Sequence, residues 1–478
     1  MLIHNCRQTA DKMFDVLNPF TKEVVDVVPS LSPMQINDAL ESSYCNKNRL
    51  SGYQRSIILS KAAKLLEEQK YNVAKLITSE SGLCIKHAMY EIDRAINCLH
   101  FSVKQAECID DIDVTKQFVS NISSQSPELT VISEPWDLAV GITPFNHPLN
   151  MVVHKVAPAI AAGTSIVIKP SEKTPLTAIK FGEILIESGL PENMLNIVTG
   201  VPAKAIVDQL VTYPGLDLVS FTGSVEIGKY IAETMANNDN QLKKYMPELG
   251  GNANFVVMED CDLDLAANIA LGAYANSGQR CTAIRRILLQ DSVAEQFIDK
   301  FVELASNVKY GDPMDPSVDM GTVISQDQAI LIEKRVNQAV AEGASILLGN
   351  IRDGALLSPT VVDRVCSTSS LVAKETFGPV ASIMRIKDLD EAIQLIRQSP
   401  FRLAGAIATA DINMANQLHN AISVGQFSLN GPPGYRTEEA PFGGFGDSGN
   451  GEKEGVVMMT RAMRRLRTFY NHKTSVSK

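Results

Sequence analysis

The sequence predicts an α/β protein built on two mostly parallel sheets, with a β-hairpin that projects from them. The main observation is a repeated alternation of short apolar segments with helical ones, which is typical of βαβ units. It begins near residue 138, with the strand-like segments "LAVGITP", "SIVIKP", "LNIVTG" and "LVSFTG". A second run extends from about residue 248 to 430, with "RRILLQ", "VASIMRI" and "AGAIATA". Because 478 residues exceed one ordinary core, we expect two or three domains.

Helices are predicted before and between these strands. Residues 52–78 carry apolar side chains at helical spacing with charges opposite, which predicts one surface helix packed on a core. Further helices are expected over 174–189 and 202–212. The strands end in Pro, Gly, Ser or Thr, and open α/β sheets bind ligands at the carboxyl ends of their strands. We therefore expect the ligand site at that edge.

Two segments depart from this rhythm. Residues 118–137 alternate as an antiparallel hairpin does, and the C-terminal "MRRLRTFYNHKTSVSK" suits a matching strand and tail. Projecting hairpins bury an edge on their own sheet or on another subunit. We expect a homo-oligomer, and the choice between homodimer and homotetramer stays open.

Composition excludes several classes of protein. Hydrophobic residues make up 45% and charged residues 21%, as in ordinary globular proteins. A net charge of −10 predicts no nucleic-acid or membrane partner, so local cations would have to hold any anionic substrate. The eight cysteines form no CxxC pairs, which predicts free thiols, no metal site and a cytoplasmic location. We find neither a signal peptide nor an apolar stretch long enough to span a membrane.

Several motifs follow predicted strands, and each also has an ordinary structural interpretation. In "FTGSVEIGK", Gly223 and Ser224 open a helix whose amides could hold a phosphate, or they form a simple βα turn. In "IKPSEKTP", Lys169 and Glu172 suit a ribose, or they form a solvated ion pair. A carboxylate there would also repel a 2′-phosphate, which favours NAD over NADP.

Three further residues have the chemistry of a catalytic centre. Asn146 in "GITPFNHPLN" lies in a rigid loop where its amide could donate to an oxyanion, or it merely forms a turn. Glu248 in "MPELGGNANFVV" could act as a general base, or it is a loop carboxylate. Cys281 in "NSGQRCT" has Arg280 directly beside it, so it is either a reactive thiol or an accident of the surface.

Taken together, the ordered motifs "TPFNHP", "KPSEKTP", "FTGSVEIGK", "ELGGNANFV", "NSGQRCT", "ETFGPV" and "APFGGFGDSG" resemble the NAD(P)-dependent aldehyde dehydrogenase superfamily over essentially the whole chain. The resemblance implies that Cys281 is the nucleophile, Glu248 the general base and Asn146 the oxyanion amide. It implies a cofactor site for NAD, with NADP less favoured, formed by Lys169, Ser171, Glu172, Gly223, Ser224, Leu249, Gly250, Glu375 and Phe377.

The resemblance also implies an aldehyde dehydrogenase-like fold of two Rossmann-type domains with an oligomerisation element. The NAD-binding domain would comprise 1–117 and 138–247, and the catalytic domain 248–432. The oligomerisation element would comprise 118–137 and 455–478. Because members that transfer the acyl group to coenzyme A commonly lack the glutamate, Glu248 points to release of a free acid.

Four cationic candidates indicate an anionic substrate: Arg280 and His147 adjoin catalytic residues, Arg436 lies in a loop that lines the entrance in this superfamily, and Arg94 lies on a bordering helix. We expect Arg280 also to lower the pKa of the Cys281 thiol. So many cations in a small tunnel would be costly without an anion. With "PGYRTE" and the residues after it, the set resembles the phosphonoacetaldehyde dehydrogenases, which predicts oxidation of phosphonoacetaldehyde to phosphonoacetate.

Alternatives remain open. Each cationic side chain could be structural, and the aldehyde could instead be sulfoacetaldehyde, succinate semialdehyde or lactaldehyde. A different class of function is a non-catalytic structural or binding relative. The presence of Cys281, Glu248 and Asn146 together argues against that class, because a protein without catalysis has no need of all three.

Overall fold

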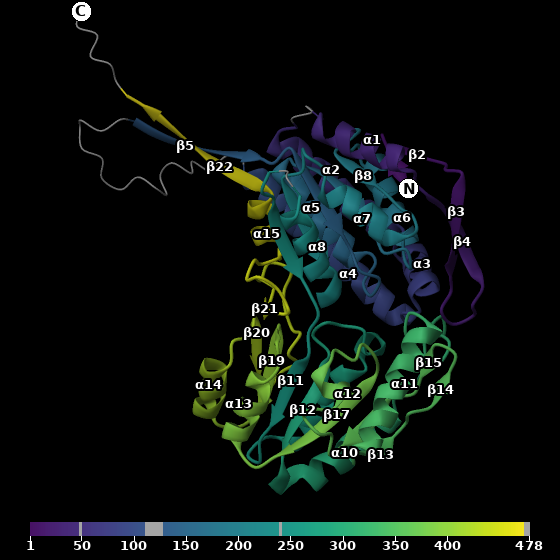
Figure 1. The fold of residues 1–478 in the computed structure, drawn as a ribbon, viewed down its shortest axis with the longest axis vertical. Coiled ribbons are helices and arrows are strands. Elements are labelled where there is room, and N and C mark those ends of the chain that lie inside the picture. Colours follow the sequence, from purple (N-terminus) through teal and green to yellow (C-terminus); the bar gives the residue numbers. More distant parts are fainter. Residues whose placement is uncertain (47–49, 110–127, 239–240, 473–478) are drawn as a thin grey trace, which may run out of the picture.

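The computed structural model describes residues 1–46, 50–109, 128–238 and 241–472. They form two seven-stranded sheets, each flanked by helices and lying one above the other in Figure 1. All seven strand segments expected from the α/β rhythm are strands of these sheets. The prediction of two parallel α/β sheets is confirmed.

The first sheet has the strand order β10-β9-β6-β7-β8-β1-β2. Its five central and edge strands β6 to β10 run parallel, and β1 and β2 add antiparallel pairs at the other edge. The strands are β1 (Leu2–Ile3), β2 (Cys6–Arg7), β6 (Leu138–Ile142), β7 (Ser165–Lys169), β8 (Leu195–Ile197), β9 (Leu218–Thr222) and β10 (Lys244–Glu248).

Alternate residues of these strands enter two different cores, as the pleat requires. In β7, Ile166 and Ile168 pack on one face and Val167 on the other. The first face is covered by α2 (Gly52–Glu68), α3 (Lys70–Ser81), α4 (Ile85–Ile109), α5 (Asn150–Ala162), α6 (Leu176–Glu187) and α15 (Val456–Ala462). The second face is covered by α1 (Pro33–Tyr44), α7 (Ala203–Val211) and α8 (Val225–Ala236).

The second sheet has the order β13-β16-β17-β12-β11-β19-β20, with only β13 antiparallel to its neighbour. The strands are β11 (Ala253–Val257), β12 (Ile284–Gln290), β13 (Ser345–Leu348), β16 (Thr360–Asp363), β17 (Val380–Ile386), β19 (Ala404–Ala408) and β20 (Gln426–Leu429). Its two faces are covered by α9 (Leu263–Ala270) and α10 (Ala294–Ser306), and by α11 (Gln326–Ala341), α12 (Ser370–Ala373), α13 (Leu389–Arg397) and α14 (Ile412–Ala421).

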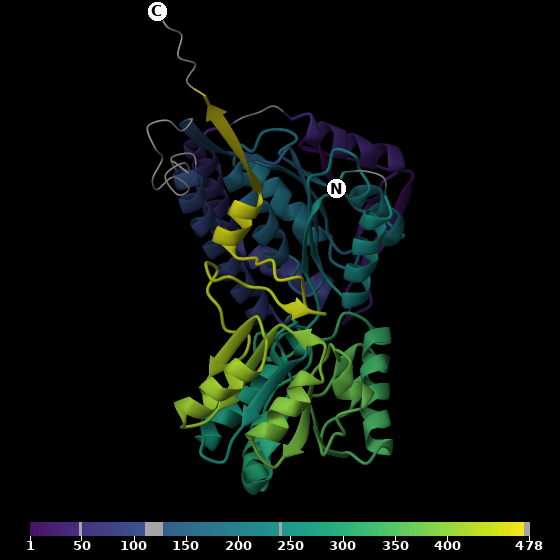
Figure 2. The ribbon, with the colours of Figure 1, turned by 60° about the vertical axis from the view of Figure 1, so that its left-hand side comes forward.

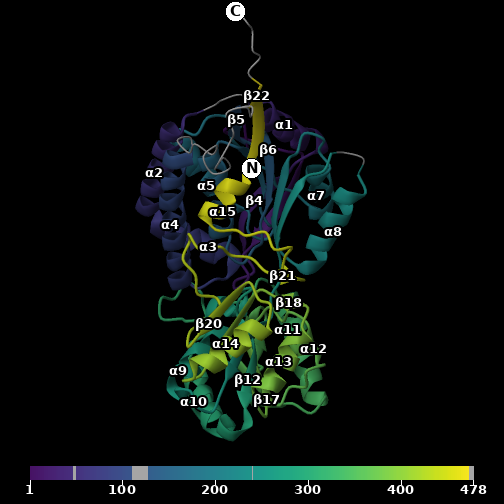
Figure 3. The ribbon, with the colours of Figure 1, turned by 90° about the vertical axis from the view of Figure 1, so that its left-hand side faces the viewer.

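After β20 the chain returns from the second sheet to the first, where α15 packs beside α5 (Figures 2 and 3). The smaller elements are β3 (Lys12–Leu17) with β4 (Val24–Ser30), β14 (Arg352–Asp353) with β15 (Leu356–Leu357), β18 (Phe401–Arg402) with β21 (Phe445–Gly446), and the short 3-10 helices η2 (Leu271–Ala273), η3 (Ala275–Gly278) and η4 (Asp291–Val293). The returning segment therefore runs between the two bodies.

A two-stranded arm projects from the first body (Figure 1). It pairs β5 (Glu128–Pro135) antiparallel with β22 (Arg464–Asn471), so the predicted C-terminal strand is confirmed. Residues 118–127 of the predicted hairpin and residues 473–478 of the tail lie outside the described residues. On the arm, Leu466, Phe469 and Tyr470 are each more than half exposed.

The single helix expected over 52–78 is wrong, because the chain bends at Gln69 between α2 and α3. Both helices still present apolar residues to the same core, Leu59 and Leu66 from one and Ala74 and Ile77 from the other. The helical periodicity therefore continues across the bend and hides it from the sequence.

Candidate active site

The loop with the predicted nucleophile lies between η3 and β12 and faces the carboxyl ends of β6, β9 and β10. A cavity of about 360 Å³ lies there. It is lined by all three predicted catalytic residues, Asn146, Glu248 and Cys281. The first two come from the first sheet and Cys281 from the chain entering the second, so both bodies form the site.

The nucleophile loop has an irregular backbone. Asn276 and Ser277 have φ angles of +56° and +53°, which interrupt the 3-10 segment η3 with left-handed backbone. Gly278 follows with φ +68°, and a Cβ there would lie 2.0 Å from the carbonyl oxygen of Gly378. Positive φ angles at three successive residues exclude a regular helix here, and the close approach to Gly378 requires a residue without a Cβ at position 278.

Asn146 is tied to this loop through two amides. Its Nδ2 donates to the carbonyl oxygen of Gln279 at 2.7 Å, which leaves its second amide hydrogen for another acceptor. The Nδ2 of Asn276 in turn donates to the Asn146 carbonyl oxygen at 2.9 Å. Glu91 holds the next part of the loop by accepting from the backbone N–H groups of Leu149 and Asn150, at 2.9 Å each.

The Cys281 thiol is less acidic than expected. Burial raises its pKa to about 11, with the carboxyls of Glu375 and Glu248 acting in the same direction. Arg280 and Arg436 act in the opposite direction and do not prevail. The expected lowering by Arg280 is thus present, but the pKa of the thiol rises overall, because loss of solvent around the thiolate outweighs the guanidinium charge.

Glu248 is buried, with 4% of its surface exposed. Burial raises the pKa of its carboxyl well above the usual value, and Glu454 adds to the shift. One oxygen, Oε2, has no hydrogen-bond partner among the described residues. The other, Oε1, lies so close to Gly443 that a Cβ at that position would be only 2.4 Å from it. A carboxyl with a raised pKa and a free oxygen has the properties of a general base.

Six of the nine predicted cofactor residues line the same cavity: Gly223, Ser224, Leu249, Gly250, Glu375 and Phe377. Ser224 caps α8 by accepting from the N–H of Ile227. Glu375 accepts from the N–H of Gly251 at 3.0 Å, and the ring of Phe377 packs edge-on against Phe145 with centroids 6.0 Å apart. The loop ends and the helix start therefore open into the cavity.

The other three cofactor candidates follow β7, outside the residues that line this cavity. Lys169 is 4% exposed, and its Nζ lies 3.8 Å from Oε2 of Glu172. Burial lowers the pKa of Lys169. Ser171 accepts from the N–H of Lys173 and shapes the turn before α6. The Lys169–Glu172 pair is real, and Glu172 stays partly exposed.

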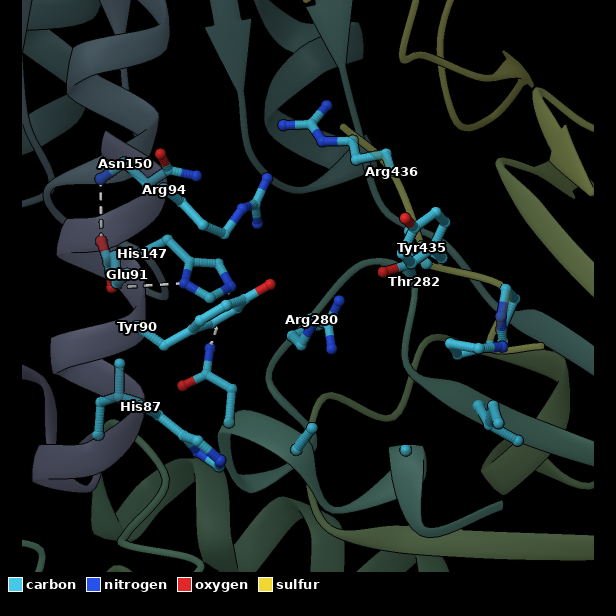
Figure 4. Close-up of a pocket in the computed structure, with 18 residues that line it drawn as sticks. His87, Tyr90, Glu91, Arg94, His147, Asn150, Arg280, Thr282, Tyr435 and Arg436 are labelled. Atoms are coloured by element: carbon cyan, nitrogen blue, oxygen red, sulfur yellow. Dashed lines mark hydrogen bonds and ion pairs between the residues drawn. The ribbon is translucent and has the colours of Figure 1, made fainter. Parts of the chain in front are cut away.

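A second cavity, of about 290 Å³, adjoins the first and is lined by the four predicted cationic residues, Arg94, His147, Arg280 and Arg436 (Figure 4). Two exposed tyrosines, Tyr90 and Tyr435, flank it. Arg94, His147, Arg280 and Arg436 line both cavities, so they lie where the two cavities adjoin, and Cys281 lines only the larger one.

These four side chains differ in whether a carboxylate already pairs with them. Arg94 makes a two-point ion pair with Glu438, at 2.6 Å and 3.2 Å, and the Nδ1 of His147 lies 3.4 Å from Oε2 of Glu91. The side chain of Arg280 has no hydrogen-bond or ion-pair partner among the described residues. Arg94 therefore already has a counter-charge, whereas Arg280 does not, and the role of Arg94 in substrate binding stays a prediction.

Arg436 is also without a carboxylate partner in the described chain. Its Nη1 is buried and makes no hydrogen bond, while its guanidinium stacks 4.1 Å from the ring centre of Phe442. Burial lowers the pKa of both Arg280 and Arg436, and the mutual repulsion of these arginines and Arg94 adds to the effect. Two uncompensated guanidinium groups thus face the cavities.

Glu438 is one of the functional residues that the sequence did not reveal. Burial would raise the pKa of its carboxyl, yet contacts with His154 and Arg94 lower it to about 2. Nε2 of His154 lies 2.5 Å from Oε2 of Glu438. The "RTEEAP" motif contains this residue, but only the fold brings it to helices α4 and α5.

Comparison with known proteins decides the family. The aldehyde dehydrogenase family model matches residues 6–468. The chain belongs to the aldehyde dehydrogenase family. A 3-sulfolactaldehyde dehydrogenase of Priestia megaterium is 34% identical over 94% of this chain and 92% of its own. A lactaldehyde dehydrogenase of Methanococcus maripaludis is 33% identical over 96% of this chain and 97% of its own.

Among solved structures, the NADP-dependent glyceraldehyde-3-phosphate dehydrogenase of Bacillus halodurans, in complex with NADP, superposes with a TM-score of 0.92. It is 32% identical and covers 98% of each chain. The predicted aldehyde dehydrogenase fold and enzyme class are confirmed, and the protein is an NAD(P)-dependent aldehyde dehydrogenase. Phosphonoacetaldehyde as its substrate stays a prediction. Within the described ranges, no helix of this aldehyde dehydrogenase is both long and apolar enough to cross a bilayer.

Proposed function

We propose that this aldehyde dehydrogenase oxidises a small anionic aldehyde to the free acid, through a thioester on Cys281. The Cys281 thiol would give its proton to Glu248, the carboxyl in the same cavity, and the resulting thiolate would add to the aldehyde carbon. The second amide hydrogen of Asn146 and the backbone N–H of Cys281 would then donate to the developing alkoxide, each donor contributing about 3 kcal/mol. The arrangement of Asn146 and Cys281 at one cavity supports these roles.

The residues around the cavity fit a nicotinamide dinucleotide. Gly223 and Ser224 directly precede α8, and the backbone N–H groups at the start of this helix suit a pyrophosphate. When bound, NAD supplies the hydride acceptor that turns the adduct into the thioester. Glu172 beside Lys169 would accept ribose hydroxyls, and its carboxylate favours NAD over NADP.

Glu248 would serve as the base for thioester hydrolysis. Its burial raises the pKa of the carboxyl, and Oε2 is free to contact a water. Water attacks the acyl carbon, the C–S bond breaks, and the thiolate leaves with the acid released. The presence of this carboxyl supports a free acid as product.

The observation that carries the anionic substrate is the difference in pairing among the arginines. Arg94 is neutralised by Glu438, while Arg280 and Arg436 are not paired with any described carboxylate. Holding two partly buried guanidinium groups without a paired carboxylate is costly, and an anion that binds both removes the cost. A planar guanidinium also matches phosphonate, sulfonate and carboxylate oxygens at two points.

Two unpaired cations match a dianion best, so phosphonoacetaldehyde is the favoured substrate. Arg280 adjoins Cys281, which leaves room for only a short chain between the aldehyde and the charge. A sulfonated aldehyde is the second candidate, because the 34%-identical relative is a 3-sulfolactaldehyde dehydrogenase. Lactaldehyde, the substrate named for another relative, has no charge to occupy the arginines.

Steady-state NADH formation tests the proposal, with phosphonoacetaldehyde, sulfoacetaldehyde, succinate semialdehyde, lactaldehyde and propionaldehyde, without coenzyme A. We expect kcat/KM for phosphonoacetaldehyde to exceed that for propionaldehyde about 100-fold, which corresponds to roughly 2.7 kcal/mol. A flat profile would refute anion recognition. Cys281→Ala should abolish oxidation of every aldehyde, and activity that survives it would refute the role of Cys281.

The exposed apolar arm supports a homo-oligomer. Leu466, Phe469 and Tyr470 are exposed on β22, which pairs with β5 as its one strand neighbour in the described part of the chain. We propose that the arm is the oligomerisation element, with the NAD-binding and catalytic domains as predicted from the sequence. Sedimentation velocity of the full chain tests this, and a monomer at micromolar concentration would contradict it.

A further inference from the structure

Arg285 follows the nucleophile by four residues and is not part of the mechanism above. It is the second residue of β12 and only 2% exposed. Its Nη2 donates to the carbonyl oxygens of Gly278 and Arg280, at 2.9 Å each, and its Nη1 donates to the carbonyl oxygen of Thr376. One buried guanidinium thus holds three backbone carbonyls.

The contact with Arg280 fixes the orientation of one peptide group. The carbonyl of Arg280 and the N–H of Cys281 belong to the same planar trans peptide, so they point in opposite directions. The carbonyl oxygen accepts from Arg285 and from the N–H of Ala283 at 3.1 Å. The N–H of Cys281 makes no hydrogen bond to any residue that the structure describes. Pulling the carbonyl towards Arg285 therefore leaves this N–H directed away, available to an oxyanion.

Through its contact with Thr376, the Arg285 guanidinium also binds the segment that carries the cofactor candidates Glu375 and Phe377. The guanidinium lies 5.2 Å from the ring centre of Phe377. Arg335 holds the other side of this segment, donating to the carbonyl oxygen of Glu375 at 2.6 Å and to Oγ1 of Thr376 at 3.1 Å. Only Arg285 of these two arginines also reaches the nucleophile loop.

We propose that Arg285 is a positioning residue that aligns the Cys281 N–H as an oxyanion donor and ties the nucleophile loop to the Glu375–Phe377 segment. The inference rests on the proposed function, in which Cys281 is the nucleophile. Burying a cation costs free energy, and the hydrogen bonds of Arg285 to three carbonyls of two loops offset part of that cost while holding the two loops together. Arg285 touches no reacting atom, so its effect passes through the backbone.

The neighbouring Arg286 provides a matched control. It is equally buried, at 3% exposure, but its Nη2 donates to the carbonyl oxygen of Leu395, on the side away from the nucleophile loop. Arg286→Met should lower thermal stability as much as Arg285→Met does. It should leave kcat within about threefold of the wild type, since it holds neither catalytic loop.

For Arg285→Met we expect kcat with the preferred aldehyde to fall about 10- to 100-fold, because a loosened oxyanion donor loses most of its effect. KM for the aldehyde should change by less than about threefold, since the arginines that bind the anion remain. Guanidinium ions added to Arg285→Ala should restore part of kcat. If Arg285→Met does not fold, Arg285→Lys, which keeps the charge and loses the fork, carries the same test.

A double-mutant cycle with Asn146→Ala measures the coupling between the kcat losses of the two variants. A purely structural role of Arg285 would give no such coupling. Both side chains would support one oxyanion, so the loss in the double variant should be smaller than the product of the single losses. Equal kcat losses in Arg285→Met and Arg286→Met, or independent multiplication with Asn146→Ala, would overturn the inference. Activity retained in Cys281→Ala would instead refute the proposed function, so the two failures are distinct.

Discussion

Replacing Arg436 with methionine separates substrate recognition from folding. The change removes one of two uncompensated guanidinium groups beside Cys281 and keeps a long side chain against Phe442. A hydrogen bond to a charged group contributes about 1.5 to 3 kcal/mol. Loss of that interaction should therefore lower kcat/KM for phosphonoacetaldehyde about 10- to 150-fold.

The same change should not weaken the folded enzyme. Nη1 of Arg436 is buried without a hydrogen-bond partner, and burial already lowers the pKa of this guanidinium. Removing an unpaired buried charge relieves a desolvation cost, so we expect the melting temperature of Arg436→Met to equal or exceed that of the wild type. Loss of anion recognition with retained stability is the signature of a binding residue.

The assay is kcat/KM for phosphonoacetaldehyde and propionaldehyde on the same enzyme preparation. Propionaldehyde should lose less than about threefold, because it offers no charge to Arg436. Arg364→Met, an exposed arginine beside Asp363 on the second sheet, is the control and should change neither value. Equal losses on the two aldehydes would refute the reasoning, since they would mean that Arg436 only braces its loop.

Three further predictions follow from the charges of the site. Arg280→Met removes a group that lowers the pKa of the Cys281 thiol, so this pKa should rise above about 11. Alkylation of the free enzyme by iodoacetamide at pH 8 should therefore be slower than in the wild type, and an unchanged rate would contradict this. Glu172→Gln should raise kcat/KM for NADP relative to NAD about 10-fold, and an unaltered ratio would exclude Glu172 as the discriminating residue. The pKa of Glu438 is lowered to about 2, so its contribution to stability is present above its unfolded value of about 4.5 and is lost as the pH falls towards 2. Glu438→Gln should therefore cost about 3 to 5 kcal/mol at pH 7 by leaving Arg94 unpaired, and the difference from the wild type should shrink in acid; equal unfolding midpoints at pH 7 would disprove it.

The sequence alone predicts most of the scaffold, because its signals are local. Short apolar segments that end in turn residues predict β6, β7 and β9, and the loops after β6 and β9 hold Asn146 and Ser224. The bend at Gln69 escapes, since the apolar spacing of both helices suits one core. Ordered motifs around Cys281 and Glu248 likewise predict the family, which the comparisons confirm.

What the sequence cannot determine is which charges remain uncompensated. In the sequence, nothing distinguishes Arg94 from Arg436 as a substrate-binding cation. In the fold, Glu438, which lies 344 residues from Arg94, pairs with Arg94 and not with Arg436. The thiol of Cys281 has an arginine beside it in the chain, yet its pKa rises, because burial by both bodies outweighs that neighbour. Desolvation and ion pairing depend on residues brought together through space, so tertiary structure alone decides them.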